Sequence, residues 1–116
     1  MATYTKRKLS GSADGRGILV VSTASPGTLI HTAVAGTNDL DEIWLYAVNN
    51  TTASSTTTFQ FGGVNNYDTI SAYIPSKTGL ELVVPGLLLQ NGSEVRVFTN
   101  VSSGIIIQGF VNRITA

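Results

Sequence analysis

Turn-forming residues recur along this chain at intervals of roughly 8–12 residues, and they separate short segments that are apolar or alternate between apolar and polar. Ser25-Pro26-Gly27, Pro85-Gly86 and Asn91-Gly92 are the clearest of these signals. Such intervals leave little room for helices and their connections, and no segment shows a helical period. The pattern therefore predicts an all-β chain.

The segments between the turn signals define about eight expected strands. Their spacing is typical of a single antiparallel β-sandwich, here expected to be jelly-roll-like, and we prefer this architecture to a closed barrel. Pro85-Gly86 is expected to end one strand, and Asn91-Gly92 to form a hairpin turn before the next. The expected strands cover residues 17–23, 28–34, 40–49, 54–61, 68–74, 79–84, 94–99 and 105–114.

The segment 40–49 carries apolar side chains on both of its faces. Ile43, Leu45 and Ala47 alternate with Trp44, Tyr46 and Val48. We therefore expect this strand to be central in its sheet and covered on both sides.

The composition suits strands and turns and offers few charges. Thr, Ser, Asn and Gly number 15, 11, 8 and 12 among 116 residues, and charged residues make up only 12%. Interfaces between subunits are depleted in Lys and Glu, and this chain is poor in both. We therefore expect a chain that binds other protein subunits.

The charges are unevenly distributed along the chain. Residues 1–16 hold four basic groups (Lys6, Arg7, Lys8 and Arg16) against Asp14, a balance of +3, while the remaining hundred hold three basic and six acidic groups, a balance of −3. We expect residues 1–16 to form an extended basic N-terminal arm and residues 17–116 to form the sandwich. The arm is interpreted either as a solvated tail or as a contact to an acidic protein surface. Nucleic acid is an unlikely partner, because the cluster is short and the body lacks a basic face.

The residues that usually carry chemistry are scarce. The sequence has no Cys, no Gly-x-Ser-x-Gly motif and a single histidine, His31, which we expect to bond to a neighbour or to water. Asp39, Asp41 and Glu42 form the one acidic cluster, which we interpret as a solvated entry into a strand rather than as a Ca²⁺ site. We therefore predict no enzyme activity, no metal and no cofactor.

Several sequence patterns together resemble small virion structural proteins of tailed bacteriophages, and the resemblance covers nearly the whole chain. They are the polar segment 8–16 before an apolar strand, the segments 29–36 and 41–47, the segment 59–63, and the segments 83–87 and 109–114. These are strand and turn patterns, so they specify a fold better than a role.

The resemblance implies a head decoration (cement) protein that binds and stabilises the capsid lattice in many copies. Its expected partners are the major capsid protein or other virion proteins, and Lys6, Arg7, Lys8 and Arg16 would face an acidic capsid surface. A homo-oligomer, a trimer by analogy, is expected on the capsid surface after assembly in the host cytoplasm. We expect no membrane contact, since no apolar run reaches the ~18 residues of a membrane span. Alternatives are a neck, tail or fibre-associated subunit, or a carbohydrate-binding adhesion module.

Overall fold

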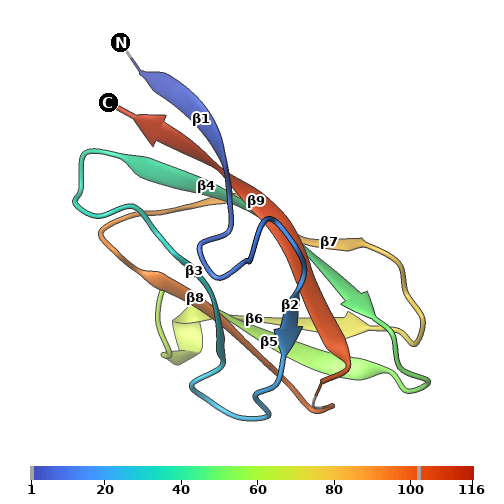
Figure 1. The fold of residues 1–116 in the computed structure, drawn as a ribbon. Coiled ribbons are helices and arrows are strands. Elements are labelled where there is room, and N and C mark those ends of the chain that lie inside the picture. The colour runs from blue at the N-terminus through green and yellow to red at the C-terminus, as the bar shows by residue number, and fades with distance from the viewer. Residues whose placement is uncertain (1, 102) are drawn as a thin grey trace.

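The computed structural model describes residues 2–101 and 103–116, and these residues form nine strands in two antiparallel sheets (Figure 1). The all-β class expected from the sequence is confirmed. A short helical turn, η1 (Asn66–Asp68), precedes β6. The strands are β1 (Thr3–Lys8), β2 (Ile18–Val20), β3 (Thr28–Thr32), β4 (Leu40–Asn49), β5 (Ser55–Phe61), β6 (Thr69–Ile74), β7 (Glu81–Leu89), β8 (Glu94–Thr99) and β9 (Ile105–Thr115).

The strands pair as a long hairpin that has been rolled up. β5 pairs with β6, β4 with β7, β3 with β8 and β2 with β9, all antiparallel, so the pairs are nested around the β5–β6 connection. Sheet A has the order β1-β9-β4-β7, with β2 also on β9, and sheet B has the order β3-β8-β5-β6. This nesting of eight strands across two sheets is the jelly-roll arrangement, with β1 added at the edge of sheet A.

The core lies between the two sheets and is built from alternate residues of their strands. Ile43, Leu45, Ile107 and Val111 of sheet A are buried against Phe59, Val95 and Val97 of sheet B. Three buried hydroxyl groups in sheet B, those of Ser55, Thr57 and Thr99, satisfy one another by hydrogen bonds.

β4 is central in sheet A, as expected, but the prediction that both of its faces are covered is wrong. Buried and half-buried residues alternate along the whole strand. Ile43, Leu45 and Ala47 face the core, while Trp44 and Tyr46 face outward. The reason is that a two-layer sandwich covers each sheet on one side only.

The prediction that Pro85-Gly86 ends a strand is wrong. β7 runs through both residues, because its register against β4 shifts between Ile43 and Trp44 and again between Leu45 and Tyr46. Gly86 has a φ of 87°, a conformation open to glycine at little cost, and its position beside Pro85 in an edge strand fits such a bulge.

Asn91-Gly92 forms a turn but not the expected hairpin. Both residues have positive φ, 61° and 70°, as a tight turn requires. The flanking strands β7 and β8 lie in different sheets, however, and the turn instead donates backbone hydrogen bonds to the carbonyl groups of Gly36 and Val34. The turn therefore closes one end of the sandwich.

Residues 2–16 are extended over β1, and β1 belongs to the sandwich. β1 pairs with β9 from Thr3 opposite Thr115 to Lys8 opposite Phe110. Leu9 then enters the core with 1% of its surface exposed, and the Gly11 N–H donates to the Ile30 carbonyl. The basic segment is thus held in place by pairing and by an apolar anchor.

Replacing Leu9 by alanine tests this anchor. We expect Leu9→Ala to lower the free energy of unfolding by about 2–4 kcal/mol, because it leaves a cavity in a packed core. Leu80→Ala is the control, since Leu80 is 64% exposed and its truncation should change stability by less than about 0.5 kcal/mol. Urea denaturation followed by Trp44 fluorescence measures both. Equal, small effects would show that the N-terminal segment does not contribute to the core.

Candidate binding surface

The outward-facing residues of sheet A form a broad surface in which aromatic and aliphatic side chains predominate. The strand registers place these residues in rows across β1, β9, β4 and β7. We call this surface the outer face of sheet A; it comprises Tyr4, Lys6 and Lys8 of β1, Ile106, Gln108, Phe110, Asn112 and Ile114 of β9, Glu42, Trp44, Tyr46 and Val48 of β4, and Leu82 and Leu88 of β7.

An aromatic pair occupies the middle of this face. Trp44 and Phe110 lie directly opposite each other on β4 and β9, and their rings are stacked with centroids 6.1 Å apart and an interplanar angle of 9°. The Lys6 Nζ lies 4.8 Å from the centroid of the Phe110 ring, within the range of a cation–π contact. Gly86 leaves room for the indole, since a Cβ there would lie 3.0 Å from Cζ2 of Trp44.

One carboxylate sits beside the aromatic pair. Glu42 Oε1 accepts hydrogen bonds from Trp44 Nε1 and Asn112 Nδ2, each at 2.9 Å. The hydrogen bonds from Asn112 and Trp44 hold the pKa of Glu42 below its ordinary value. Glu42 therefore orients the indole, and its charge is already shared with two donors.

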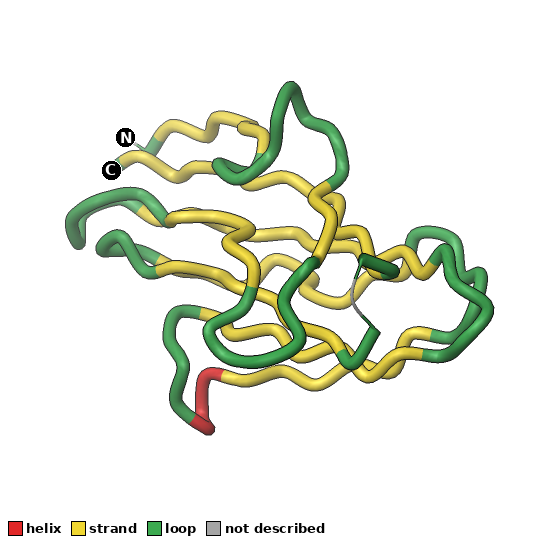
Figure 2. The backbone as a smooth tube through the Cα atoms, turned by 60° about the horizontal axis from the view of Figure 1, so that its bottom comes forward, coloured by secondary structure: helices red, strands yellow, loops and turns green. Residues whose placement is uncertain are grey.

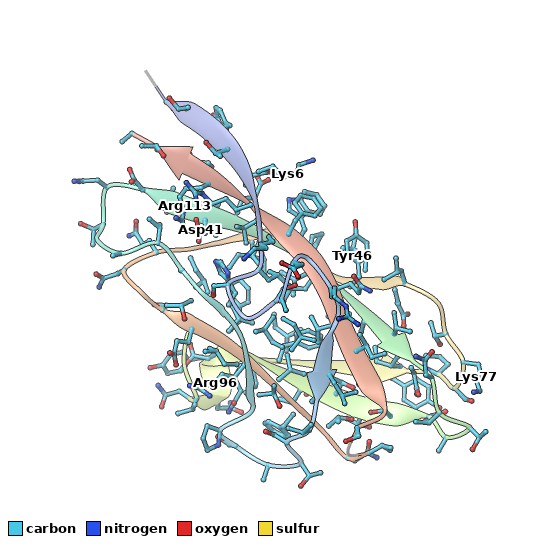
Figure 3. All side chains as sticks on the ribbon, in the orientation of Figure 1. Lys6, Asp41, Tyr46, Lys77, Arg96 and Arg113 are labelled. Carbon is cyan, nitrogen blue, oxygen red and sulfur yellow. The ribbon has the colours of Figure 1, made fainter. Side chains whose placement is uncertain are left out.

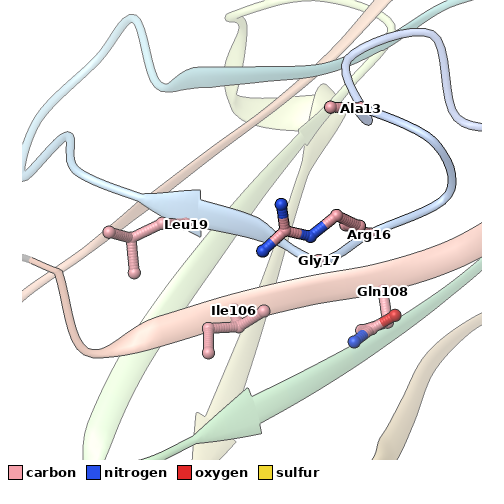
Figure 4. A pocket seen from close by; sticks show the side chains of 6 residues that line it. All are labelled: Ala13, Arg16, Gly17, Leu19, Ile106 and Gln108. Carbon is pink, nitrogen blue, oxygen red and sulfur yellow. The ribbon is translucent and has the colours of Figure 1, made fainter.

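The structure separates the four basic residues that the sequence proposed as contacts. Lys6 and Lys8 lie on the outer face of sheet A, alongside Phe110. Arg16 reaches the same face at its far end, where it lines a shallow pocket with Leu19, Ile106 and Gln108 (Figure 4). Strand alternation places Arg7 on the opposite side of β1, where it lines a pocket with His31 and Arg113 that Lys8 also borders.

The opposite side of sheet A holds a buried polar network (Figure 3). Asp41 is fully buried and accepts hydrogen bonds from Arg113 Nε at 2.7 Å, from Arg113 Nη2 at 3.0 Å and from the Val34 N–H at 3.1 Å. His31 Nε2 lies 2.8 Å from the Asp41 Oδ2, and His31 Nδ1 accepts the Ser10 N–H at 2.9 Å. The expectation that His31 bonds to neighbours is confirmed.

The acidic cluster is not the solvated entry that the sequence indicated. Asp41 points inward to His31 and Arg113, whereas Glu42 points outward to Trp44. Asp39 Oδ1 instead accepts the backbone N–H of Ala116. Asp41 and Glu42 diverge because residues on a strand alternate in direction, and Asp39 precedes β4. No group of metal-ligating side chains occurs within residues 2–101 and 103–116.

Sequence reasoning found Trp44, Tyr46 and Val48 but assigned them to a covered strand face, and it placed Lys6 and Lys8 in a separate arm. The signal that could have identified the face is the apolar residues on both sides of β4. In a fold of only two layers, one of those sides must face outward. The outer face of sheet B is polar along β5, where Thr56 and Thr58 face outward, but it also carries the aromatic side chains of Tyr73 and Phe98. The aromatic and aliphatic outer face of sheet A, with Trp44 and Phe110 at its middle, is the candidate binding surface.

Replacing Asp41 by asparagine tests the buried network. We expect Asp41→Asn to lower the free energy of unfolding at pH 7 by about 3 kcal/mol, because Arg113 loses its buried partner. Burial alone would raise the pKa of Asp41, but the hydrogen bonds from Arg113 and His31 outweigh burial and lower it below the ordinary value of 3.8. The stability given by the ionised carboxylate is therefore complete above 3.8 and is lost as pH falls through the lowered pKa.

Urea titrations of the wild type and of Asp41→Asn between neutral and acid pH measure this difference, which should shrink as the pH falls below 3.8. Glu94→Gln is the control, because the Glu94–Arg96 pair is solvent-exposed and should contribute at most about 1 kcal/mol. A difference between wild type and Asp41→Asn that is independent of pH would contradict the assignment.

No protein-family model, curated protein or solved structure matches this chain. Within the described part of the chain, no helix has the length and apolar character needed to cross a membrane. The function is therefore argued from the geometry of the outer face of sheet A.

Proposed function

We propose that this chain is a structural subunit of a bacteriophage virion, of the capsid decoration type, that docks on the head lattice through the outer face of sheet A. The observation that carries the proposal is the continuous aromatic and aliphatic surface around Trp44 and Phe110, with Lys6, Lys8 and Arg16 as its basic groups. Its role is binding and not catalysis. The partner is the major capsid protein or another virion protein.

The surface has the anatomy of a protein interface. Aromatic anchors lie at its centre, and charged side chains lie around them. Three basic groups, Lys6, Lys8 and Arg16, stand against the single carboxylate of Glu42, which already accepts two hydrogen bonds. Such a surface favours an acidic partner, whose association would be accelerated by charge and weakened by salt.

The fold is compatible with this role. Jelly rolls occur in viral capsid domains, and also in lectins and cupins. The fold by itself therefore does not select a function, and the choice depends on the surface. A neck, tail or fibre-associated position would use the same surface on a different partner.

Reversing the charge of the two lysines on the outer face of sheet A tests the proposed docking. We expect the purified protein to co-sediment with expanded capsids that lack it, to saturate at a fixed ratio to the capsid subunit, and to bind less tightly as salt is added. The double variant Lys6→Glu/Lys8→Glu should raise the dissociation constant about tenfold or more, because charge complementarity is lost.

Arg7→Glu is the matched control, because Arg7 lies between the two lysines in the same strand, is also exposed, and alternates to the other side of the sheet. It should bind like the wild type. Equal losses for Arg7→Glu and for the lysine variant would overturn the assignment of the face, and no capsid binding by the wild type would overturn the decoration role. Binding to a glycan array that disappears in Trp44→Ala would support the adhesion module instead.

A further inference from the structure

Strands at the edge of a sheet carry unpaired backbone groups, and proteins usually protect them against pairing with other chains. The edges of sheet A show such protection. β1 carries the charges of Lys6, Arg7 and Lys8, β2 is only three residues long, and β7 contains Pro85 and two register shifts. Each of these is a known way to discourage strand addition.

In sheet B, the edge formed by β3 is also covered. The connection between β1 and β2 lies along it, with the Gly11 N–H donating to the Ile30 carbonyl and the Thr32 N–H donating to the Ser10 hydroxyl. The strand also contains a register shift between Leu29 and His31. An added strand would have to displace this loop.

β6, at the other edge of sheet B, has none of these features. Its six residues, Thr69–Ile74, include no charge, no proline and no register shift, and four of them (Thr69, Ile70, Tyr73 and Ile74) favour strands by type. Figure 2 shows β6 leaving the red helical turn and running along the lower rim of the molecule. β6 is therefore the one unprotected edge strand among the described residues.

The direction of the backbone groups of β6 follows from its neighbour β5. The Thr56 N–H donates to the Asn100 side chain and the Asn100 N–H donates to the Thr56 carbonyl, so the Thr56 backbone faces β8. Alternation then turns Thr57 toward β6, where it meets Ala72. The backbone groups of Ser71 and Tyr73 consequently point to the free edge.

The sequence of β6 is complementary to itself in the antiparallel direction. A two-fold axis at Ser71 places Ser71 opposite Ser71 of a second copy, Thr69 opposite Tyr73, and Ile70 opposite Ala72. On the outer side of the sheet, aromatic Tyr73 thus meets β-branched Thr69. On the inner side, the large Ile70 meets the small Ala72. No charge meets a like charge, as would happen if the basic strand β1 paired with itself.

The side of the sandwich next to β6 is also incomplete. A shallow groove runs between β6 and β7 and is lined by Ile70, Ala72, Leu82 and Val83. Within the described part of the chain, the Oε2 atom of Glu81 in this groove is buried without a hydrogen-bond partner. Tyr73, on the rim, is 66% exposed. A second copy placed here would cover an apolar groove as well as an open edge.

We propose that two copies of this chain associate through β6, antiparallel about a two-fold axis at Ser71, and so join two four-stranded sheets B into one continuous sheet. The contact lies at the edge of sheet B, whereas the docking residues Lys6, Lys8 and Trp44 lie on sheet A; the two surfaces share Leu82, which lines the groove and also belongs to the outer face of sheet A. It produces a dimer, whereas a trimer requires a different and heterologous contact.

Charged substitutions at Ser71 test the dimer. Sedimentation equilibrium should show a dimer of the wild type that dissociates on dilution. Ser71→Lys and Ser71→Glu each place like charges opposite each other at the axis, and each should raise the dissociation constant about fivefold or more. Mixing the two variants should restore a heterodimer, because opposite charges then face each other.

Thr56→Lys is the control, because Thr56 is exposed on the same face of sheet B but away from the free edge; it should leave the dimer intact. Circular dichroism verifies that each variant is folded. The proposal would be overturned by a wild type that stays monomeric at high concentration or forms a trimer. It would also be overturned by a dimer whose dissociation constant is unchanged by either charge at position 71. The Lys6→Glu/Lys8→Glu variant should dimerise normally, so a failure of capsid docking and a failure of dimerisation are distinguished.

Discussion

The antiparallel pairing of β9 with β4 determines where most of the structure lies. The two strands are matched over ten consecutive residues, from Leu40 opposite Ile114 to Asn49 opposite Ile105. Gly109 allows this close approach, because a Cβ there would lie 2.0 Å from the carbonyl oxygen of Trp44. The other edge of β9 then accepts β2 and β1 in succession, and β4 accepts β7. Since side chains alternate along a strand, this one register divides the residues of sheet A into core and outer face.

That division explains how sheet A can carry an aromatic outer face while its core remains intact. Ile43 and Leu45 pack inward, and Trp44 and Tyr46 of the same strand point outward, so the surface and the core are supported by the same backbone. In sheet B the outward positions of β5, Thr56 and Thr58, are polar, although Tyr73 and Phe98 also face outward there. Two sheets of one sandwich thus differ in the chemistry of their outer faces, and the difference lies in the sequence and not in the fold.

Local patterns in the sequence predicted the strands far better than their partners. Leu40–Asn49 and Glu94–Thr99 agree with the expected strands at both ends, because alternation and turn residues act within a few positions. Pro85 was misjudged, since a proline is tolerated in an edge strand and edge positions depend on the sheet order. The inward direction of Asp41 was missed for a related reason. Its partners His31 and Arg113 are 10 and 72 residues away, and only the nested pairing brings them together.

The N-terminal segment shows how this pairing changes the functional argument. A disordered basic arm would lose conformational entropy when it ordered on a partner, and that loss would weaken binding. Here β1 is paired with β9, Leu9 is buried, and the Ser10 N–H donates to a His31 ring whose other nitrogen bonds to the buried Asp41. Lys6 and Lys8 are therefore presented from an ordered strand beside Phe110. Because their backbone is already fixed, the docking that we propose would require ordering of side chains alone, which would leave more of the contact energy available for affinity.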